Sequence, residues 1–128
     1  MTITLITGAN KGLGYETARR LVAAGHTVLV GARDPQLGSA AATALGARFV
    51  HIDVTNDESV AAAVANVAEH EGSIDVLINN AGISGTHGDA AELSGSDVLA
   101  VFDVNVAGVV RMTTAFLPLL RTSSDPVI

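Results

Sequence analysis

The 128-residue sequence contains no cysteine and no tryptophan, and only 3% of its residues are aromatic. Without cysteine, neither a disulfide framework nor a thiolate metal site can form. The four histidines fall in different predicted elements, so a histidine metal site has little support either. Because 48% of the residues are hydrophobic and so few are aromatic, the core must consist of Val, Ile, Leu and Ala, which suits close packing of helices on a parallel sheet.

Positive charge is also scarce, since seven Lys and Arg against 13 Asp and Glu give a net charge of −6. We therefore expect no nucleic-acid partner, because binding to phosphate backbones needs a basic face. No uninterrupted apolar run reaches the ~20 residues of a membrane span, and the N-terminus enters a strand without a signal peptide. Together with the lack of cysteine, these features predict a cytoplasmic protein with no membrane contact.

What the sequence does contain is a regular alternation of strand and helix patterns. Strands are expected at 3–6, 27–30, 48–53 and 74–79, and helices at 15–24, 35–45, 55–71 and 96–121. Residues 126–128 look like the start of a fifth strand. The alternation predicts an α/β fold, a Rossmann-like doubly wound parallel sheet with right-handed crossovers and helices on both faces. Residues 1–128 then form one dinucleotide-binding domain, cut off after the fifth strand begins.

Several local signals mark the expected element boundaries. Asp34 before Pro35 is typical of an N-cap followed by proline at the first helical position. Thr55 and Glu58 have the spacing of a capping box. Residues 82–93 form a long loop that could fold over a ligand. In the last helix, Pro118 should cause a kink or an end, and one apolar face is expected from Leu99, Phe102, Val106, Val109, Thr113, Phe116 and Leu120.

A glycine-rich loop between the first strand and the first helix is the strongest functional signal. Gly8, Gly12 and Gly14 allow left-handed backbone and close approach of a ligand, where a Cβ would collide with its oxygens. The first turn of the helix offers free N–H groups that suit a diphosphate. The alternative is a glycine-rich turn with no ligand, since the spacing G-x-x-x-G-x-G differs from the dinucleotide fingerprint G-x-G-x-x-G.

The end of the second strand is where a dinucleotide fold meets the adenosine ribose. An acidic residue there would bind the 2′-hydroxyl, but this chain has Arg33, which offers a fork of donors to a 2′-phosphate. Lys11 could supply a second positive charge. Either residue could instead be a solvated surface charge, and Asp34 is better explained as a helix cap than as a ribose ligand. The pattern predicts NADP(H) rather than NAD(H).

The motifs Thr7-Gly8-x-x-x-Gly12-x-Gly14, Asp53, Asn79-Asn80-Ala81-Gly82 and Asn105 inside a long helix together resemble the N-terminal half of the short-chain dehydrogenase/reductase family. The resemblance covers the whole chain. It implies that the loop, with Asn10, Lys11 and Leu13, binds the diphosphate, and that Asp53 and Val54 contact the adenine. Ala81 and Gly82 would lie against the cofactor ribose, while Asn79 and Asn80 mainly stabilise the sheet, Asn80 from within the cofactor site.

For Asn105 the resemblance implies a catalytic part, because in the family such an Asn bends the helix and holds a water of the proton relay. The alternative is a partner-satisfied polar residue in the core, and Asp53 could likewise be only an N-cap neighbour at a strand end. The family's catalytic Ser and Tyr-x-x-x-Lys are missing from these 128 residues. Tyr15 is the only tyrosine and begins the first helix, and Ser123 and Ser124 are typical of a turn.

Three hypotheses follow. In the first, the chain is the cofactor-binding part of an NADP(H)-dependent oxidoreductase that acts on a small carbonyl or alcohol substrate and, like its family, forms homo-oligomers. In the second, it is a truncated, non-catalytic cofactor-binding fragment, as the missing Ser, Tyr and Lys suggest. In the third, it is a nucleotide-responsive regulatory module whose partner the sequence does not disclose.

Overall fold

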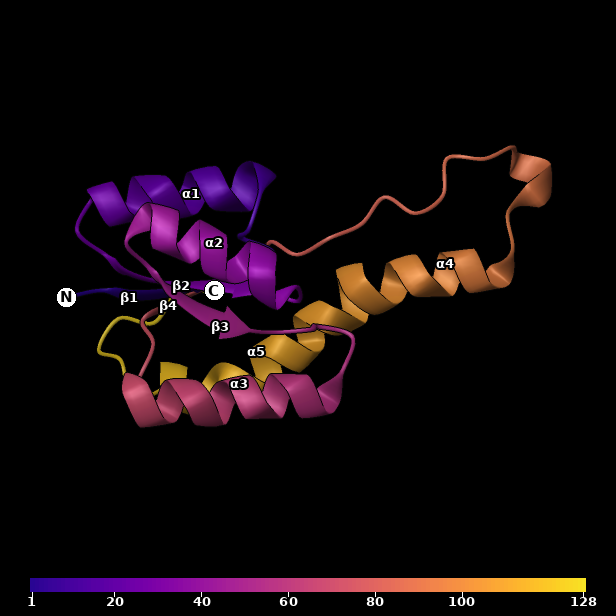
Figure 1. The fold of residues 1–128 in the computed structure, drawn as a ribbon. Helices are drawn as coiled ribbons and strands as arrows, with labels where there is room; N and C mark the ends of the chain where they lie inside the picture. Colours follow the sequence, from indigo (N-terminus) through magenta and orange to yellow (C-terminus); the bar gives the residue numbers. More distant parts are fainter.

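The computed structural model describes all 128 residues, and their strands and helices alternate as the sequence predicts (Figure 1). The strands are β1 (Ile3–Ile6), β2 (Thr27–Ala32), β3 (Arg48–His51) and β4 (Val76–Ile78). The helices are α1 (Gly12–Ala23), α2 (Pro35–Leu45), α3 (Asp57–His70), the short 3-10 helix η1 (Ala90–Glu92), α4 (Gly95–Phe102), the π-helical η2 (Asp103–Ala107) and α5 (Gly108–Leu120).

All four strands are parallel and lie in the order β3-β2-β1-β4. The chain therefore winds outward from β1 to β3 and then crosses to the other side of β1, which makes the sheet doubly wound. Val127 pairs with Val76 on the free side of β4, and the Leu77 N–H donates to the Val127 carbonyl at 3.0 Å. The expected fifth strand thus begins next to β4.

Side chains alternate between the two faces of the sheet, and each face is covered by a pair of helices. Leu5 and Leu29 join the larger core under α3 and α5, whereas Ile6, Val28 and Val30 join the smaller core under α1 and α2. Figure 1 shows these two helical layers on opposite sides of the strands. The core contains no buried Tyr and a single buried Phe, as the composition predicts.

The predicted helix boundaries hold at α2 and fail at α3. Asp34 caps α2 by accepting from the Leu37 N–H at 2.9 Å. The capping box expected at Thr55 is wrong, because the Thr55 hydroxyl donates to Asp53 at 2.7 Å and is no longer available to the helix. Asn56 is the N-cap of α3 instead, and accepts from the Ser59 N–H at 2.8 Å.

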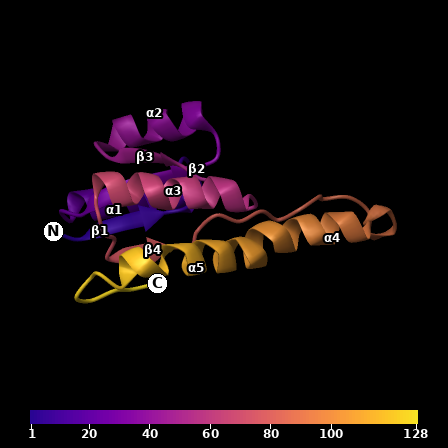
Figure 2. The same ribbon diagram turned by 90° about the horizontal axis from the view of Figure 1, so that it is seen from below.

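The last helix is continuous from α4 through η2 to α5, but its expected single apolar face is wrong. Phe116 and Leu120 are buried, whereas Leu99, Phe102 and Val106 are exposed. The π-helical turn inserts one residue and rotates the stripe, and α4 extends beyond the sheet with the 82–93 loop beside it (Figures 1 and 2). Pro118 does not end the helix, which continues to Leu120.

By length and composition, the continuous helix Gly95–Leu120 could cross a membrane, since an 18-residue window reaches a mean hydropathy of 1.4. It is not an uninterrupted apolar run, because Asp97, Asp103 and Arg111 lie within it. Core helices of soluble proteins meet the same criterion, and α5 packs against α3 and β4. Length and composition alone assign no membrane role to it.

Candidate functional site

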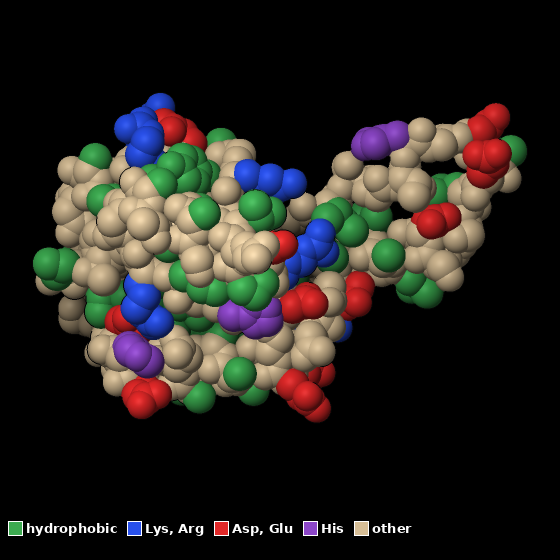
Figure 3. Space-filling model, in the orientation of Figure 1, with side chains coloured by type: hydrophobic (Ala, Val, Ile, Leu, Met, Phe, Trp, Pro, Cys, Tyr) green, Lys and Arg blue, Asp and Glu red, His purple; other side chains and the backbone are tan.

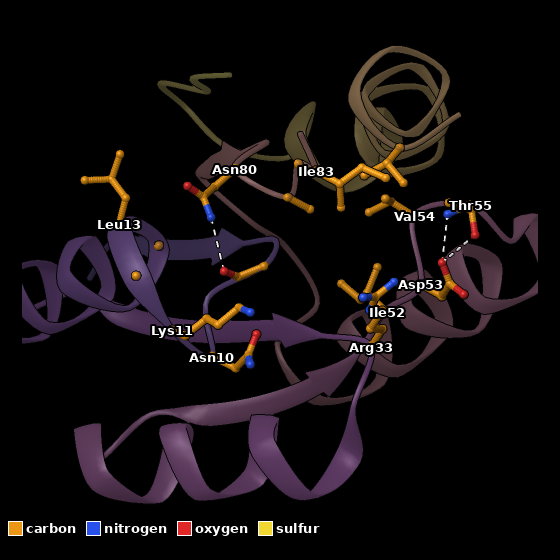
Figure 4. Close-up of a pocket in the computed structure, with 16 residues that line it drawn as sticks. Asn10, Lys11, Leu13, Arg33, Ile52, Asp53, Val54, Thr55, Asn80 and Ile83 are labelled. Carbon is orange, nitrogen blue, oxygen red and sulfur yellow. Dashed lines mark hydrogen bonds between the residues drawn. The ribbon is translucent and has the colours of Figure 1, made fainter. Parts of the chain in front are cut away.

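A cleft of about 300 Å³ lies at the carboxyl ends of β1, β2 and β4, where the strand order reverses (Figure 4). Ligands of doubly wound sheets bind at this position. All twelve residues predicted to bind a cofactor line the cleft: Gly8, Asn10, Lys11, Gly12, Leu13, Gly14, Arg33, Asp53, Val54, Asn80, Ala81 and Gly82. Ile52, Thr55, Ile83 and Val104 complete the lining, and no sequence pattern singles these four out.

The start of α1 forms one wall of the cleft. Among the helices α1, α2 and α3, which follow strands, only α1 begins without a side-chain cap. Lys11 is its N-cap residue, and its side chain caps nothing. The N–H groups of Gly12, Leu13 and Gly14 have no acceptor in the protein, whereas α2, α3 and α4 are all capped by side chains. Gly12 has a φ of +60°, and a Cβ there would meet no atom within 4 Å. The free donors and open space fit an anionic group such as a diphosphate.

Gly8 and Gly14 lie where segments of the protein approach one another, and Gly8 also has the expected left-handed backbone, with a φ of +63°. A Cβ on Gly14 would overlap Asn80 Nδ2 and lie 2.7 Å from the Gly8 carbonyl oxygen, and one on Gly8 would lie 2.9 Å from the Ala81 Cα. A Cβ at either position would therefore clash with the protein itself. These two glycines let α1, β1 and the segment after β4 approach closely.

Thr7 joins the end of β1 to the segment after β4 and was not predicted as a site residue. It is 2% exposed, and its hydroxyl oxygen accepts from the N–H groups of Asn80 and Ala81, both at 3.0 Å. The Asn80 amide returns two hydrogen bonds, to the carbonyls of Thr7 at 3.0 Å and Gly8 at 3.1 Å. The signals for Thr7 in the sequence were its place at the end of an apolar strand and at the start of the glycine motif. Asn79 donates to the Thr113 hydroxyl at 3.2 Å and so ties β4 to α5.

Two basic side chains reach the cleft without a carboxylate partner. Lys11 and Arg33 line it and are exposed, and neither forms an ion pair, whereas Arg19, Arg20, Arg48 and Arg111 all do. In Figure 4 Lys11 extends from the glycine loop and Arg33 from the end of β2. Basic side chains also line the hollow between the body and the projecting arm in Figure 3. The cleft therefore has a positive rim in an acidic protein.

Asp53 and Val54 form the wall opposite the glycine loop. The hydroxyl and the N–H of Thr55 both donate to Asp53 Oδ1, at 2.7 and 2.9 Å, and these bonds lower the pKa of the Asp53 carboxyl, with smaller contributions from Arg33 and His51. The carboxylate is thus held ionised. Asp53 does not cap α3 itself, but its N–H donates to Ser59 in the first turn of that helix at 2.9 Å, so its contact with a ligand stays a prediction.

Asn105 lies in η2 and reaches the cleft through the backbone of Ile83. Its Nδ2 donates to the Ile83 carbonyl and its Oδ1 accepts from the Ile83 N–H, both at 2.8 Å. Ile83 lines the cleft, while Asn105 itself is exposed and does not. The side chain is therefore satisfied by a partner, but at the surface rather than in the core. Its predicted catalytic part stays a prediction.

The only tyrosine and the serine pair near the C-terminus do not line the cleft. Tyr15 packs with the core under α1, and the Ser123 hydroxyl donates to Asp75 at 2.6 Å, next to the start of β4. No group of three or more His, Asp or Glu side chains could hold a metal ion. The cleft thus combines free backbone donors, two basic side chains and the Asp53 carboxylate, and can bind and orient a charged ligand.

Comparisons with known proteins give a consistent picture. A family model described as short chain dehydrogenase matches residues 2–128. The chain is 44% identical to a short-chain dehydrogenase, anuI, of Penicillium roqueforti, over 94% of this chain and 50% of that protein. It is 34% identical to an NADPH-dependent pterin aldehyde reductase of Arabidopsis thaliana, over 97% of this chain and 53% of that protein.

Among solved structures, the chain matches a 3-ketoacyl-(acyl-carrier-protein) reductase from Brucella melitensis complexed with NADH, with a TM-score of 0.87 and 31% identity. The match covers 94% of this chain and 50% of that one. The chain thus spans about half the length of the relatives it matches.

Proposed function

Because the chain belongs to the short-chain dehydrogenase family, we propose that its cleft binds NADP(H) and that it forms the cofactor-binding part of an oxidoreductase acting on a small carbonyl or alcohol. The observation that carries the proposal is the uncapped start of α1, with its three free N–H groups, next to the unpaired Lys11 and Arg33. A dinucleotide phosphate needs this combination of backbone donors and positive charge.

The residues of the cleft suit successive parts of such a cofactor. The N–H groups of Gly12 to Gly14 would hold the diphosphate, and Arg33 with Lys11 would bind a 2′-phosphate on the adenosine ribose. Val54 offers an apolar surface to the adenine, and Asp53 an acceptor beside it. Ala81 and Gly82 would border the ribose at the other end. When bound, the nicotinamide supplies the hydride chemistry, and the protein holds and orients it.

NADP(H) is proposed over NAD(H) because no free carboxylate stands at the end of β2. Asp34 is the nearest acid in sequence, and its carboxylate accepts from the Leu37 N–H at 2.9 Å as the cap of α2. Arg33 is exposed and has no acidic partner, so its guanidinium is available. The names of the relatives leave the choice open, since one mentions NADPH and one solved structure holds NADH.

Titration of NADPH and NADH by fluorescence or calorimetry tests the proposal. Removing the charge-assisted contacts in Arg33→Ala should cost about 1.5–3 kcal/mol, which weakens NADPH binding roughly ten- to a hundredfold and leaves NADH binding nearly unchanged. Arg121→Ala is a matched control, because Arg121 is also exposed and unpaired but does not line the cleft. An unchanged NADPH/NADH preference in Arg33→Ala would contradict the NADP(H) assignment.

A non-catalytic cofactor-binding module is the second candidate, and it is supported by the lack of the family's Ser and Tyr-x-x-x-Lys among these 128 residues. The assay follows NADPH absorbance in the presence of a panel of aldehydes and ketones. Steady oxidation by the purified 128-residue chain would exclude the binding module. Tight NADPH binding without turnover would support it for this chain.

We further propose a homo-oligomer, supported by the apolar stripe on the projecting arm. Leu99 is 71% exposed, Val110 60% and Phe102 54%, and no part of the chain covers them. A contiguous apolar surface of this kind is typical of protein interfaces. Sedimentation should therefore detect association, and Val106→Asp within the stripe should abolish it. A wild-type monomer at micromolar concentration would contradict the proposal.

A further inference from the structure

Arg111 is the most highly bonded cation of the molecule, yet the cofactor site described above does not use it. Its Nη2 pairs with Asp103 Oδ1 at 2.7 Å, and its Nε pairs with Asp57 Oδ1 at 3.2 Å. Its Nη1 donates to two backbone carbonyls, that of Val54 at 3.0 Å and that of Asp103 at 3.2 Å. One guanidinium thus joins η2, the start of α3 and the segment between β3 and α3.

The bond to the Val54 carbonyl is the one that bears on the cleft. Val54 is 8% exposed and lines the cleft between Asp53 and Thr55. On its other side it packs against α5 at Gly108, where a Cβ would lie 2.9 Å from Val54 Cγ2 and 3.3 Å from the Val54 carbonyl oxygen. Gly108 lets the helix approach, and Arg111, one turn further on, bonds to the backbone of the approaching segment.

The same stretch of helix also holds the facing wall. Asn105 in η2 hydrogen-bonds to the N–H and to the carbonyl of Ile83, and the adjacent Val104 lines the cleft. The π-helical turn is closed by the Gly108 N–H, which donates to the Asp103 carbonyl, and Arg111 donates to that same oxygen. The two walls, at Val54 and at Ile83, are therefore both anchored to η2 and the first turn of α5.

We propose that Arg111 is a positioning residue for the adenosine end of the cofactor cleft, holding the Asp53–Thr55 wall at a fixed separation from the Ile83 wall. The inference rests on the proposed function, because it takes the ligand to be a dinucleotide. Arg111 is too far along α5 to line the cleft and acts through Val54. A lysine cannot replace it, because a single ammonium group on a flexible stem cannot span acceptors on three segments.

The test compares the wild type with Arg111→Lys in the whole chain. The matched control is Arg48→Lys, which disrupts an equally well-formed pair, that of Arg48 with Glu71 at 2.6 Å, away from the cleft. Calorimetry with NADPH and with 2′,5′-ADP, which carries only the adenosine half, gives the affinities. Hydrogen exchange of peptides that cover residues 52–56 reports directly on the wall. Asp57→Asn removes one anchor of Arg111 at an exposed side chain and provides a milder second variant.

We expect Arg111→Lys to weaken NADPH and 2′,5′-ADP by the same factor, about three- to tenfold, and to speed exchange at 52–56. Asp57→Asn should lower the affinity for both ligands about twofold. Arg48→Lys should lose a comparable amount of thermal stability but should change neither affinity. Wild-type affinity for 2′,5′-ADP in Arg111→Lys would overturn the inference, as would an equal loss in Arg48→Lys. If the wild type bound neither ligand, the proposed function would fail. Unchanged hydrogen exchange at residues 52–56 in Arg111→Lys would separately refute the claim that Arg111 fixes Val54 in place.

Discussion

Replacing Gly14 by alanine should show how closely the glycine loop packs on the rest of the site. The new methyl group would overlap Asn80 Nδ2 and lie 2.7 Å from the Gly8 carbonyl oxygen and 3.1 Å from the Ala9 Cα. The Asn80 amide cannot move away freely, because it donates to the carbonyls of Thr7 and Gly8. Either these hydrogen bonds break or α1 shifts away from β4.

The expected cost follows from these two responses. Overpacking a tight contact costs about 1–3 kcal/mol, and leaving a half-buried amide donor without its acceptors costs about 1–3 kcal/mol. Alanine returns at most ~1 kcal/mol through its better helix propensity. Since either response suffices, we expect Gly14→Ala to lower the free energy of unfolding by about 1–3 kcal/mol. NADPH affinity should fall as well, because the displaced segments carry Gly12 and Ala81.

Urea denaturation followed by circular dichroism measures the change, since a shift of the midpoint at constant slope reports stability alone. Gly95→Ala is the matched control, because Gly95 also lies in the first turn of a helix, but a Cβ added there would meet no atom within 4 Å. That variant should be as stable as the wild type or slightly more so. If Gly14→Ala and Gly95→Ala unfolded at the same midpoint, the packing explanation would be refuted.

Two further predictions concern stability elsewhere in the fold. Hydrogen bonds from Ser123 and the Ile3 N–H lower the pKa of the Asp75 carboxyl. The stabilisation of the fold by Asp75 is therefore complete above the unfolded pKa of about 3.9 and is lost as the pH falls through the lower folded-state pKa. The urea midpoint should fall less steeply with acid in Asp75→Asn than in the wild type, and an equal slope would contradict this role of Asp75. Gly38→Ala would place a methyl group that overlaps one edge of the Phe49 ring, at Cδ2 and Cε2, and should cost about 1–3 kcal/mol. The double variant that also carries Phe49→Leu should recover stability, and a lack of recovery would contradict this contact.

Much of the candidate site could be predicted because of a property of parallel sheets. Strand and helix periodicities place the ends of β1, β2 and β4 at Thr7, Arg33 and Asn79, and the carboxyl ends of parallel strands necessarily meet at one edge. Residues that follow these strands must therefore lie together, whatever the details of packing. For this reason every residue predicted to bind the cofactor lines the same cleft.

Two local predictions failed because hydrogen bonds decided the outcome rather than residue spacing. The capping box at Thr55 failed because Asp53 competes for the hydroxyl, and a spacing pattern contains no information on that competition. The apolar face of the last helix failed because local periodicity assumes a regular 3.6-residue turn, whereas η2 changes the phase. Both errors arise from interactions that override local preference.

The sequence by itself determined the α/β class, the order of the elements, the glycine loop and the family, because local periodicity and motif order carry this information. Only the tertiary structure decided why Gly14 must be glycine, which groups Thr7 and Asn80 bond, and that Arg111 holds Val54. These contacts join residues up to 74 positions apart. Their existence depends on how closely the layers pack, which a linear pattern does not specify.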